Sequence, residues 1–336
     1  MSKHAFLSVS VSALVAAGCG TLPEVIATQK YAKMRDQAAD VFPKIANDFY
    51  GSCMRSAGYT LLNDPPKVLD QERARTEEVC ELVAQQTKKA VNDTNSLILG
   101  YLSSLGNLAT GEAVDYKPQI DEIGKSLQSL PGLGADESKK TIDAGTSLAT
   151  FLFKLFASSY QRQQLSQSIT SYDKQLQVLV GALSSVVEKD YIGRMLKVER
   201  IALDSYYRLP IGIAKAQPRK SSIDEYVEYK LNSAWLDKQE IIRDKQAAAT
   251  NYISLLKQIS CDHSKLKDLY MNDSLKTSEN SNPFCLKVDP SIGQAGIKST
   301  NTSGILRQQK LIKSLDSYSI KLTNLARLTQ RAYPDH

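Results

Sequence analysis

Residues 165–186 read LSQSITSYDKQLQVLVGALSSV, and their apolar side chains recur at alternating steps of four and three residues. The recurring positions are Leu165, Ile169, Tyr172, Leu176, Leu179, Leu183 and Val186. This spacing places the side chains along one side of an α-helix, as in the seam of a helical bundle or coiled coil. A helix continued through 161–189 would be about 43 Å long, at a rise of 1.5 Å per residue.

Two further segments repeat this spacing. The C-terminal stripe comprises Leu311, Leu315, Tyr318, Leu322, Leu325, Thr329 and Ala332. The other comprises Val227, Leu231, Ala234, Ile241, Lys245, Ala248, Tyr252, Leu255 and Ile259, with Lys238 in the gap after Ala234. Sustained alternation with period two, the pattern of a strand, does not occur. We therefore expect an all-α fold, an elongated bundle of long amphipathic helices with heptad-like packing.

Apolar periodicity and turn-forming residues together divide the chain. We expect helices near 24–58, 70–106, 117–129, 137–189, 191–208, 221–264 and 303–332. Pro43 predicts a kink or a restart inside the first helix. Breaks are expected at 63–66, 131–134 and 209–212, and an irregular polar segment at 277–303.

The first residues have the features of a secretory signal. Lys3 is followed by an uncharged apolar run over 5–17 that ends in Gly18-Cys19. A basic start, an apolar run and small residues at its end are typical of a cleaved signal. The run is shorter than the roughly 20 apolar residues of a membrane-spanning helix.

The sequence Val15-Ala16-Ala17-Gly18-Cys19 resembles the lipobox of bacterial lipoprotein precursors. The resemblance covers about the first 20 residues and departs from the family at Ala16, where Leu is more frequent. It implies that residues 1–18 are a signal peptide, that Cys19 carries lipid, and that 19–23 tether a helical-bundle domain at 24–336. Gly20, in place of an aspartate, implies the outer membrane, facing the periplasm, in a host with two membranes.

Composition agrees with an exported, folded chain. Of the 336 residues, 42% are hydrophobic, enough to bury a core, and the mean hydropathy of −0.30 excludes a polytopic membrane protein. The net charge of +6 is too small and dispersed to predict nucleic-acid binding.

The five cysteines are Cys19, Cys53, Cys80, Cys261 and Cys285. Assigning Cys19 to lipid leaves an even set, as expected in an oxidising compartment. Four cysteines allow three pairings. We favour the local pairs Cys53–Cys80 and Cys261–Cys285, since the midpoint of each falls in a turn-like segment.

Catalytic groups are scarce. His263 is the only internal histidine. We expect its side chain to be exposed, next to a disulfide-bonded cysteine. A zinc site from Cys261, His263 and Cys285 matches no established ligand spacing. We expect no catalytic residues, no metal and no cofactor.

Two apolar groups are candidates for contact with a partner or a membrane. One lies in 147–159 and includes Phe151, Phe153 and Phe156; the other brackets the expected loop at 209–214 and includes Tyr206, Tyr207 and Trp235, with Tyr226 and Tyr229 nearby. Ordinary packing between helices is the competing interpretation of both.

These features predict a lipid-anchored envelope protein that acts as a non-enzymatic interaction, scaffold or accessory subunit. The expected partners are the membrane, through Cys19, and other envelope proteins; self-association through the helical stripes is a further option. The alternative hypothesis is a membrane-interacting or pore-forming helical bundle.

Overall fold

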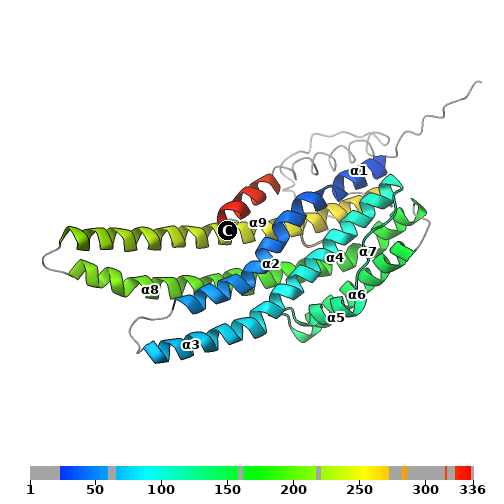
Figure 1. Cartoon of the computed structure of the whole chain (residues 1–336). Helices are drawn as coiled ribbons and strands as arrows, with labels where there is room; N and C mark the ends of the chain where they lie inside the picture. The colour runs from blue at the N-terminus through cyan, green and yellow to red at the C-terminus, as the bar shows by residue number, and fades with distance from the viewer. Residues whose placement is uncertain are drawn as a thin grey trace, which may run out of the picture.

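A computed structural model describes residues 23–59, 66–157, 162–216, 221–271, 282–285, 315 and 322–333. The expected signal peptide, Cys19 and most of the polar segment 277–303 lie outside these residues. The described part of the chain is helical throughout its regular elements and contains no strand (Figure 1). The all-α prediction is confirmed.

The helices pack side by side into an elongated bundle (Figure 1). The longest, α9, has 49 residues and is about 73 Å long. A capping box between Ser221 and Asp224 begins it. In chain order the elements are α1 (Pro23–Ala32), α2 (Met34–Gly58), α3 (Pro66–Val79), the π-helical η1 (Cys80–Ala84), α4 (Gln85–Thr110), α5 (Ile120–Gln128), α6 (Ala135–Ala157), α7 (Arg162–Val186), the π-helical η2 (Val187–Leu196), α8 (Lys197–Ala216), α9 (Ser222–Tyr270) and a last helix over 322–332.

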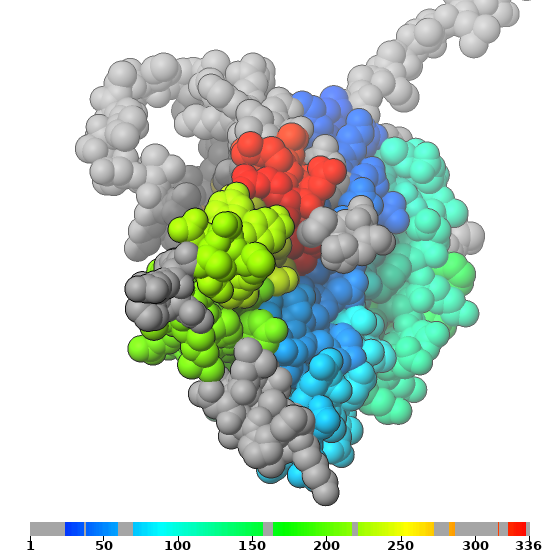
Figure 2. Space-filling model, turned by 60° about the vertical axis from the view of Figure 1, so that its left-hand side comes forward, coloured from blue at the N-terminus to red at the C-terminus, as the bar shows by residue number. Residues whose placement is uncertain are grey.

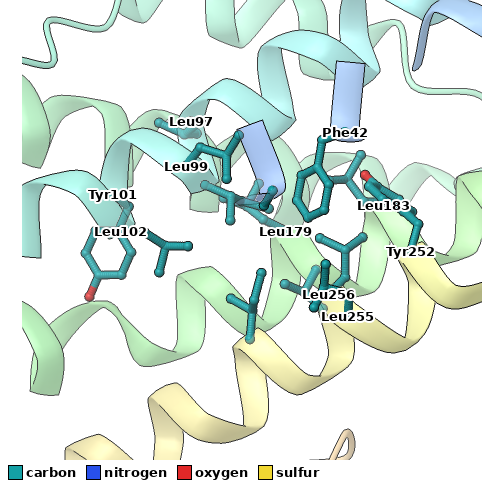
Figure 3. Close-up of a cluster of buried hydrophobic side chains, with 14 of the residues drawn as sticks. Phe42, Leu97, Leu99, Tyr101, Leu102, Leu179, Leu183, Tyr252, Leu255 and Leu256 are labelled. Carbon is teal, nitrogen blue, oxygen red and sulfur yellow. The ribbon is translucent and has the colours of Figure 1, made fainter. Parts of the chain in front are cut away.

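The predicted stripes form much of the core. Every member of the 165–186 stripe is buried except Tyr172, which is half-buried, and α7 packs against α4, α6 and α9. Figure 3 shows Leu179 and Leu183 of α7 near Leu255 and Leu256 of α9, with Phe42 of α2 beside them. The α9 stripe is buried from Lys245 to Ile259, whereas its first member, Val227, is exposed. In the C-terminal stripe, Leu315, Leu322, Leu325, Thr329 and Ala332 are buried, and Leu311 and Tyr318 lie outside the described residues.

The helix expected over 137–189 is wrong in its extent. Helix α6 ends at Ala157 and α7 begins at Arg162, and the two helices pack against each other. As two separate helices, α6 and α7 pack on each other and on α4, and α7 also packs on α9, so both apolar stripes are buried in the bundle. The expected break near residue 190 is also absent, because η2 joins α7 to α8 without interruption.

Two further boundary predictions are corrected. The loop expected at 209–212 is helical, and Pro210 lies inside α8, near its end at Ala216. The first helix restarts at Lys33, between α1 and α2, while Pro43 lies inside α2. Each proline removes one backbone hydrogen bond, a loss that the packing of a long helix outweighs.

Both local cysteine pairs are confirmed. Cys53 bonds to Cys80 with the Cα atoms 5.6 Å apart, and Cys261 bonds to Cys285 with the Cα atoms 5.0 Å apart. The first disulfide joins α2 to the start of η1. The second joins α9 to the described segment 282–285.

The long axis of the bundle has two distinct ends. Figure 1 shows the first turn of α1, the last turns of α4 and α6 and the first turn of α7 at one end, called here the α1 end. Thr28 of α1 is 3.1 Å from the Tyr270 hydroxyl at the end of α9, and Gln29 donates to the Ala109 carbonyl of α4. The opposite end, the arm end, is formed by the last turns of α8 and the first turns of α9. Figure 2 brings this end forward and shows the C-terminal helix, in red, beside the yellow-green α9.

Candidate interaction surface

An exposed apolar stripe runs along α8. Val198, Ile201, Leu209 and Ile213 are all exposed, and the side chains of Ile201 and Ile213 retain 54% and 57% of their accessible surface. At 100° per residue the four positions fall within an arc of about 120°, so they share one face of the helix. Among the described elements, α8 packs on α2, α9 and η2 with its opposite side, where Leu203 and Tyr207 are buried. These four residues are called the α8 stripe below.

An apolar groove continues the α8 stripe toward the middle of the bundle. Its cavity is about 240 Å³, with Cys53 and Ser56 of α2 between two walls. Val198, a member of the stripe, belongs to one wall together with Arg194 and Met195. The other wall comprises Thr76, Val79, Val83, Ala84 and Thr87. An apolar groove flanked by helices suits the apolar face of an amphipathic helix.

The aromatic residues proposed as contacts near the α8–α9 connection are mainly packed within the protein. Tyr207 is buried, and the ring of Tyr206 meets that of Tyr207 edge-on and that of Tyr59 at a tilt, with centroids 5.2 Å and 5.7 Å away. Trp235 is half-buried, and its indole Nε1 donates to Asp204 Oδ1 at 2.9 Å. The neighbouring Tyr226 and Tyr229 of α9 are exposed. The structure thus brings Tyr206 and Tyr207 together between helices and leaves Tyr226 and Tyr229 at the surface of the arm end.

Of the three phenylalanines of α6 that were proposed as contacts, one is packed within the protein and two are exposed. Phe151 stacks on Tyr172 of α7, with ring centroids 4.1 Å apart. Phe153 and Phe156 are exposed, with 40% and 43% of their surface accessible. The ammonium group of Lys117 lies 6.0 Å from the Phe153 ring centroid and 5.6 Å from that of Phe156.

A buried cluster of charges, which sequence reasoning missed, lies between α2, α8 and α9. Asp48 of α2 accepts hydrogen bonds from Arg55 at 2.9 Å, Tyr191 at 2.6 Å and Lys245 at 3.1 Å. Glu199 of α8 accepts from Arg55 and from Ser52. Two carboxylates thus face two cations, which offsets the cost of burying charge.

The C-terminal helix closes the charge cluster. Lys245 lies 5.5 Å from the ring centroid of Tyr333, whose hydroxyl is 2.8 Å from that of Tyr191. Burial lowers the pKa of Lys245 despite the opposing charge of Asp48. Burial also raises the pKa of Tyr191 and of Tyr333 well above the usual value. Lys245 occupies a position in the otherwise apolar stripe of α9. A lysine at a core position needs an acidic partner, so this residue was the sequence signal of a buried ion pair.

A second buried polar cluster surrounds His263, and the expectation of an exposed histidine is wrong. His263 has no accessible surface: its Nδ1 is 2.9 Å from Asp173 Oδ1, and its Nε2 is 2.8 Å from the Tyr101 hydroxyl. Tyr101 is also fully buried, and burial raises its pKa well above the usual value. An acid, a histidine and a hydroxyl in series form the catalytic group of some enzymes, in which the histidine takes the hydroxyl proton and the acid orients the histidine. In this protein His263 and Tyr101 have no accessible surface, so a substrate cannot reach them. The cluster connects α4, α7 and α9 by hydrogen bonds.

The described residues contain no group of three or more histidine, cysteine or acidic side chains arranged to hold a metal ion. Cys261 and Cys285 are bonded to each other, so they are not free to join His263 as zinc ligands. Among the described helices, none is sufficiently long and apolar to span a bilayer.

Comparison with known proteins identifies no relative. No protein family model matches the chain, and no curated protein or solved structure shows significant similarity to it.

Proposed function

We propose that this chain is a lipid-anchored envelope protein that acts as a non-enzymatic adaptor. In this proposal Cys19 holds the α1 end at a membrane, and the α8 stripe binds an amphipathic helix of an envelope protein. The observation that carries the proposal is the α8 stripe itself: four exposed apolar side chains on one face of a helix, continuous with an apolar groove.

The chemistry of the α8 stripe favours a protein partner. Helix-in-groove recognition uses apolar anchors that share one face of a helix, and Val198, Ile201, Leu209 and Ile213 share one face at steps of three, eight and four residues. Burying one aliphatic side chain contributes roughly 1.5–3 kcal/mol, so a few anchors support specific binding. The buried positions of His263 and Tyr101 support a role without catalysis at that cluster.

The anchor is tested by metabolic labelling with a fatty-acid analogue. The wild-type chain should be labelled and the Cys19→Ala variant should not. Equal labelling of the two would exclude lipid on Cys19, whatever the α8 stripe binds.

The partner is tested by photo-crosslinking in cells. A photoreactive amino acid placed at Ile201 or Ile213 should give the same crosslinked protein, and the same residue at Arg200, exposed on another side of α8, should not. Ile201→Asp combined with Ile213→Asp should abolish the product of a crosslinker placed at Leu209. Equal products from Arg200 and Ile213, or products with lipid alone, would contradict an adaptor role for this stripe. Release of dye from vesicles by the purified chain would instead support the pore-forming alternative.

A further inference from the structure

The α1 end of the bundle carries an apolar patch with basic neighbours. Phe153 and Phe156 are one helical turn apart on α6, and both are exposed. Lys117 lies over the two rings from the segment between α4 and α5, and Lys154 is exposed between them in sequence. Leu152 and Leu155 on the same helix are buried in the core, which holds the exposed rings in place. These four residues, Lys117, Phe153, Lys154 and Phe156, are called the α6 patch.

The position of the α6 patch relative to the chain's N-terminal segment suggests what covers it. Helix α6 ends at Ala157, at the same end of the long axis as Pro23, the first residue of α1 (Figure 1). Cys19 precedes Pro23 by four residues, and four extended residues reach at most about 14 Å. A bilayer that holds lipid on Cys19 therefore lies close to this end of the bundle.

The chemistry of the α6 patch matches the interface of a bilayer. Aromatic rings enter the boundary between headgroups and acyl chains, while lysine side chains extend to the phosphates. Basic residues near the surface are attracted to anionic lipids.

We propose that the α6 patch rests in the headgroup region of the bilayer that carries the lipid anchor. This inference rests on the proposed anchoring at Cys19 and adds a second point of attachment. A single tether allows the bundle to tumble about it, whereas two contacts fix which side faces the lipid. The arm end is then held away from the surface, because Trp235 lies about 50 Å along α9 from Tyr270 at the α1 end.

The native chain contains a single tryptophan, Trp235, which makes a fluorescence test direct. The full acylated chain is reconstituted in phosphatidylcholine vesicles with phosphatidylglycerol and a phospholipid spin-labelled near the headgroup. One sample is the wild type, in which Trp235 reports on the arm end. The other is Phe156→Trp combined with Trp235→Phe, in which the only tryptophan reports on the α6 patch. We expect quenching several-fold stronger at position 156 than at position 235.

Charge-reversal variants test the lysines. Lys117→Glu with Lys154→Glu, in the Phe156→Trp background, should reduce quenching, and vesicles of phosphatidylcholine alone should do the same. The matched control, Lys139→Glu with Lys140→Glu, changes two exposed lysines near the start of the same helix and should leave quenching unchanged. Circular dichroism of each variant confirms that the helices are intact.

The outcomes separate the two proposals. Weak quenching at position 156 overturns the proposal that the α6 patch contacts the bilayer, whether or not the mass of the preparation shows acylation. A preparation from the native host whose mass shows no acyl groups overturns the anchor, and strong quenching at 156 in that preparation still supports the patch. Quenching that is stronger at Trp235 than at position 156 means that the arm end meets the lipid, and this also overturns the proposal.

Discussion

The ammonium group of Lys245 lies 3.1 Å from Asp48 Oδ1, although the two residues are 197 positions apart in the chain. Asp48 belongs to α2 and Lys245 to α9, and Arg55 extends the contact to Glu199 on α8. A lysine in the middle of an apolar stripe thus joins three helices at one place. Registry between these helices depends on this cluster, because a helix shifted by one turn would leave a buried charge without its partner.

Replacing Asp48 should therefore be costly. Asp48→Asn leaves the buried Lys245 and the half-buried Arg55 with one carboxylate fewer, and breaking a buried pair such as Lys245–Asp48 typically costs about 3–5 kcal/mol. Urea unfolding followed by circular dichroism measures the change. Asp36→Asn is the matched control, since Asp36 meets Arg35 at the surface and should contribute less than about 1 kcal/mol. Equal losses for the two variants would contradict the structural role of the cluster.

Asp173 should make stability depend on pH in the acidic range. Burial acts to raise its pKa, but hydrogen bonds and charge interactions with His263, a hydrogen bond from Ser264 and the charge of Lys267 outweigh burial, so the pKa is lowered. A carboxyl whose folded-state pKa is below its unfolded value of about 3.9 stabilises the fold above that pH. This contribution is lost as the pH falls through the folded-state pKa.

The difference in unfolding free energy between wild type and Asp173→Asn should accordingly be largest near neutral pH and shrink below about pH 4. Urea titrations from pH 7 to pH 3 measure it. A difference that stays constant over the whole range would show that the ionised carboxylate is not the stabilising form.

The Cys261–Cys285 disulfide should stabilise the end of α9 and the segment that packs on it. Asn282, in that segment, donates to the Ser260 carbonyl at 3.0 Å and to Ser264 Oγ at 2.7 Å. Closing a loop of this length contributes about 3 kcal/mol, so Cys261→Ala with Cys285→Ala should lower the unfolding free energy by that order. The same double variant should then be less sensitive to added reductant than the wild type. Undiminished sensitivity would assign the stabilisation to Cys53–Cys80 instead.

Gly100 is a position where one methyl group should disturb the molecule. A Cβ there would lie 2.5 Å from the Tyr116 ring, so Gly100→Ala must displace that ring. Overpacking of this kind costs about 1–3 kcal/mol. Gly58→Ala, with no neighbouring atom within 4 Å, should change the unfolding free energy by less than about 1 kcal/mol. The penalty at Gly100 should fall in a Tyr116→Ala background, and thermal melts of the four variants complete the cycle.

The fold class was predictable because the apolar period extends over long segments. The side chains from Leu165 to Val186 repeat the helical spacing six times, and a pattern of that length has few other interpretations. The disulfides were predictable because a bend brings cysteines on its two arms to the same level. Helix ends were harder to predict: Pro210 and Gly212 are typical of loops, yet both lie inside α8, a long helix that packs on α9 and α2.

The candidate site was less accessible to sequence reasoning. His263 is adjacent to a polar residue and two positions from a cysteine, and nothing local indicates burial. Its burial depends on Tyr101 and Asp173, which are 162 and 90 positions away in the chain. The α8 stripe was predictable only in part. Leu209 and Ile213 lie in the apolar segment 209–214, but Val198 and Ile201 are isolated apolar residues, and only the structure shows that α2 and α9 cover the opposite side of the helix.

The uninterrupted length of α9 has a mechanical consequence. The single helix α9 connects the α1 end to the arm end. The charge cluster contacts it near its middle, at Lys245. With α9 held near Lys245, the part from Ser222 to Lys245 acts as a lever of about 36 Å, and a tilt of roughly 5° displaces its tip by about 3 Å. A force applied at the arm end is therefore transmitted along α9 to the α1 end as a torque.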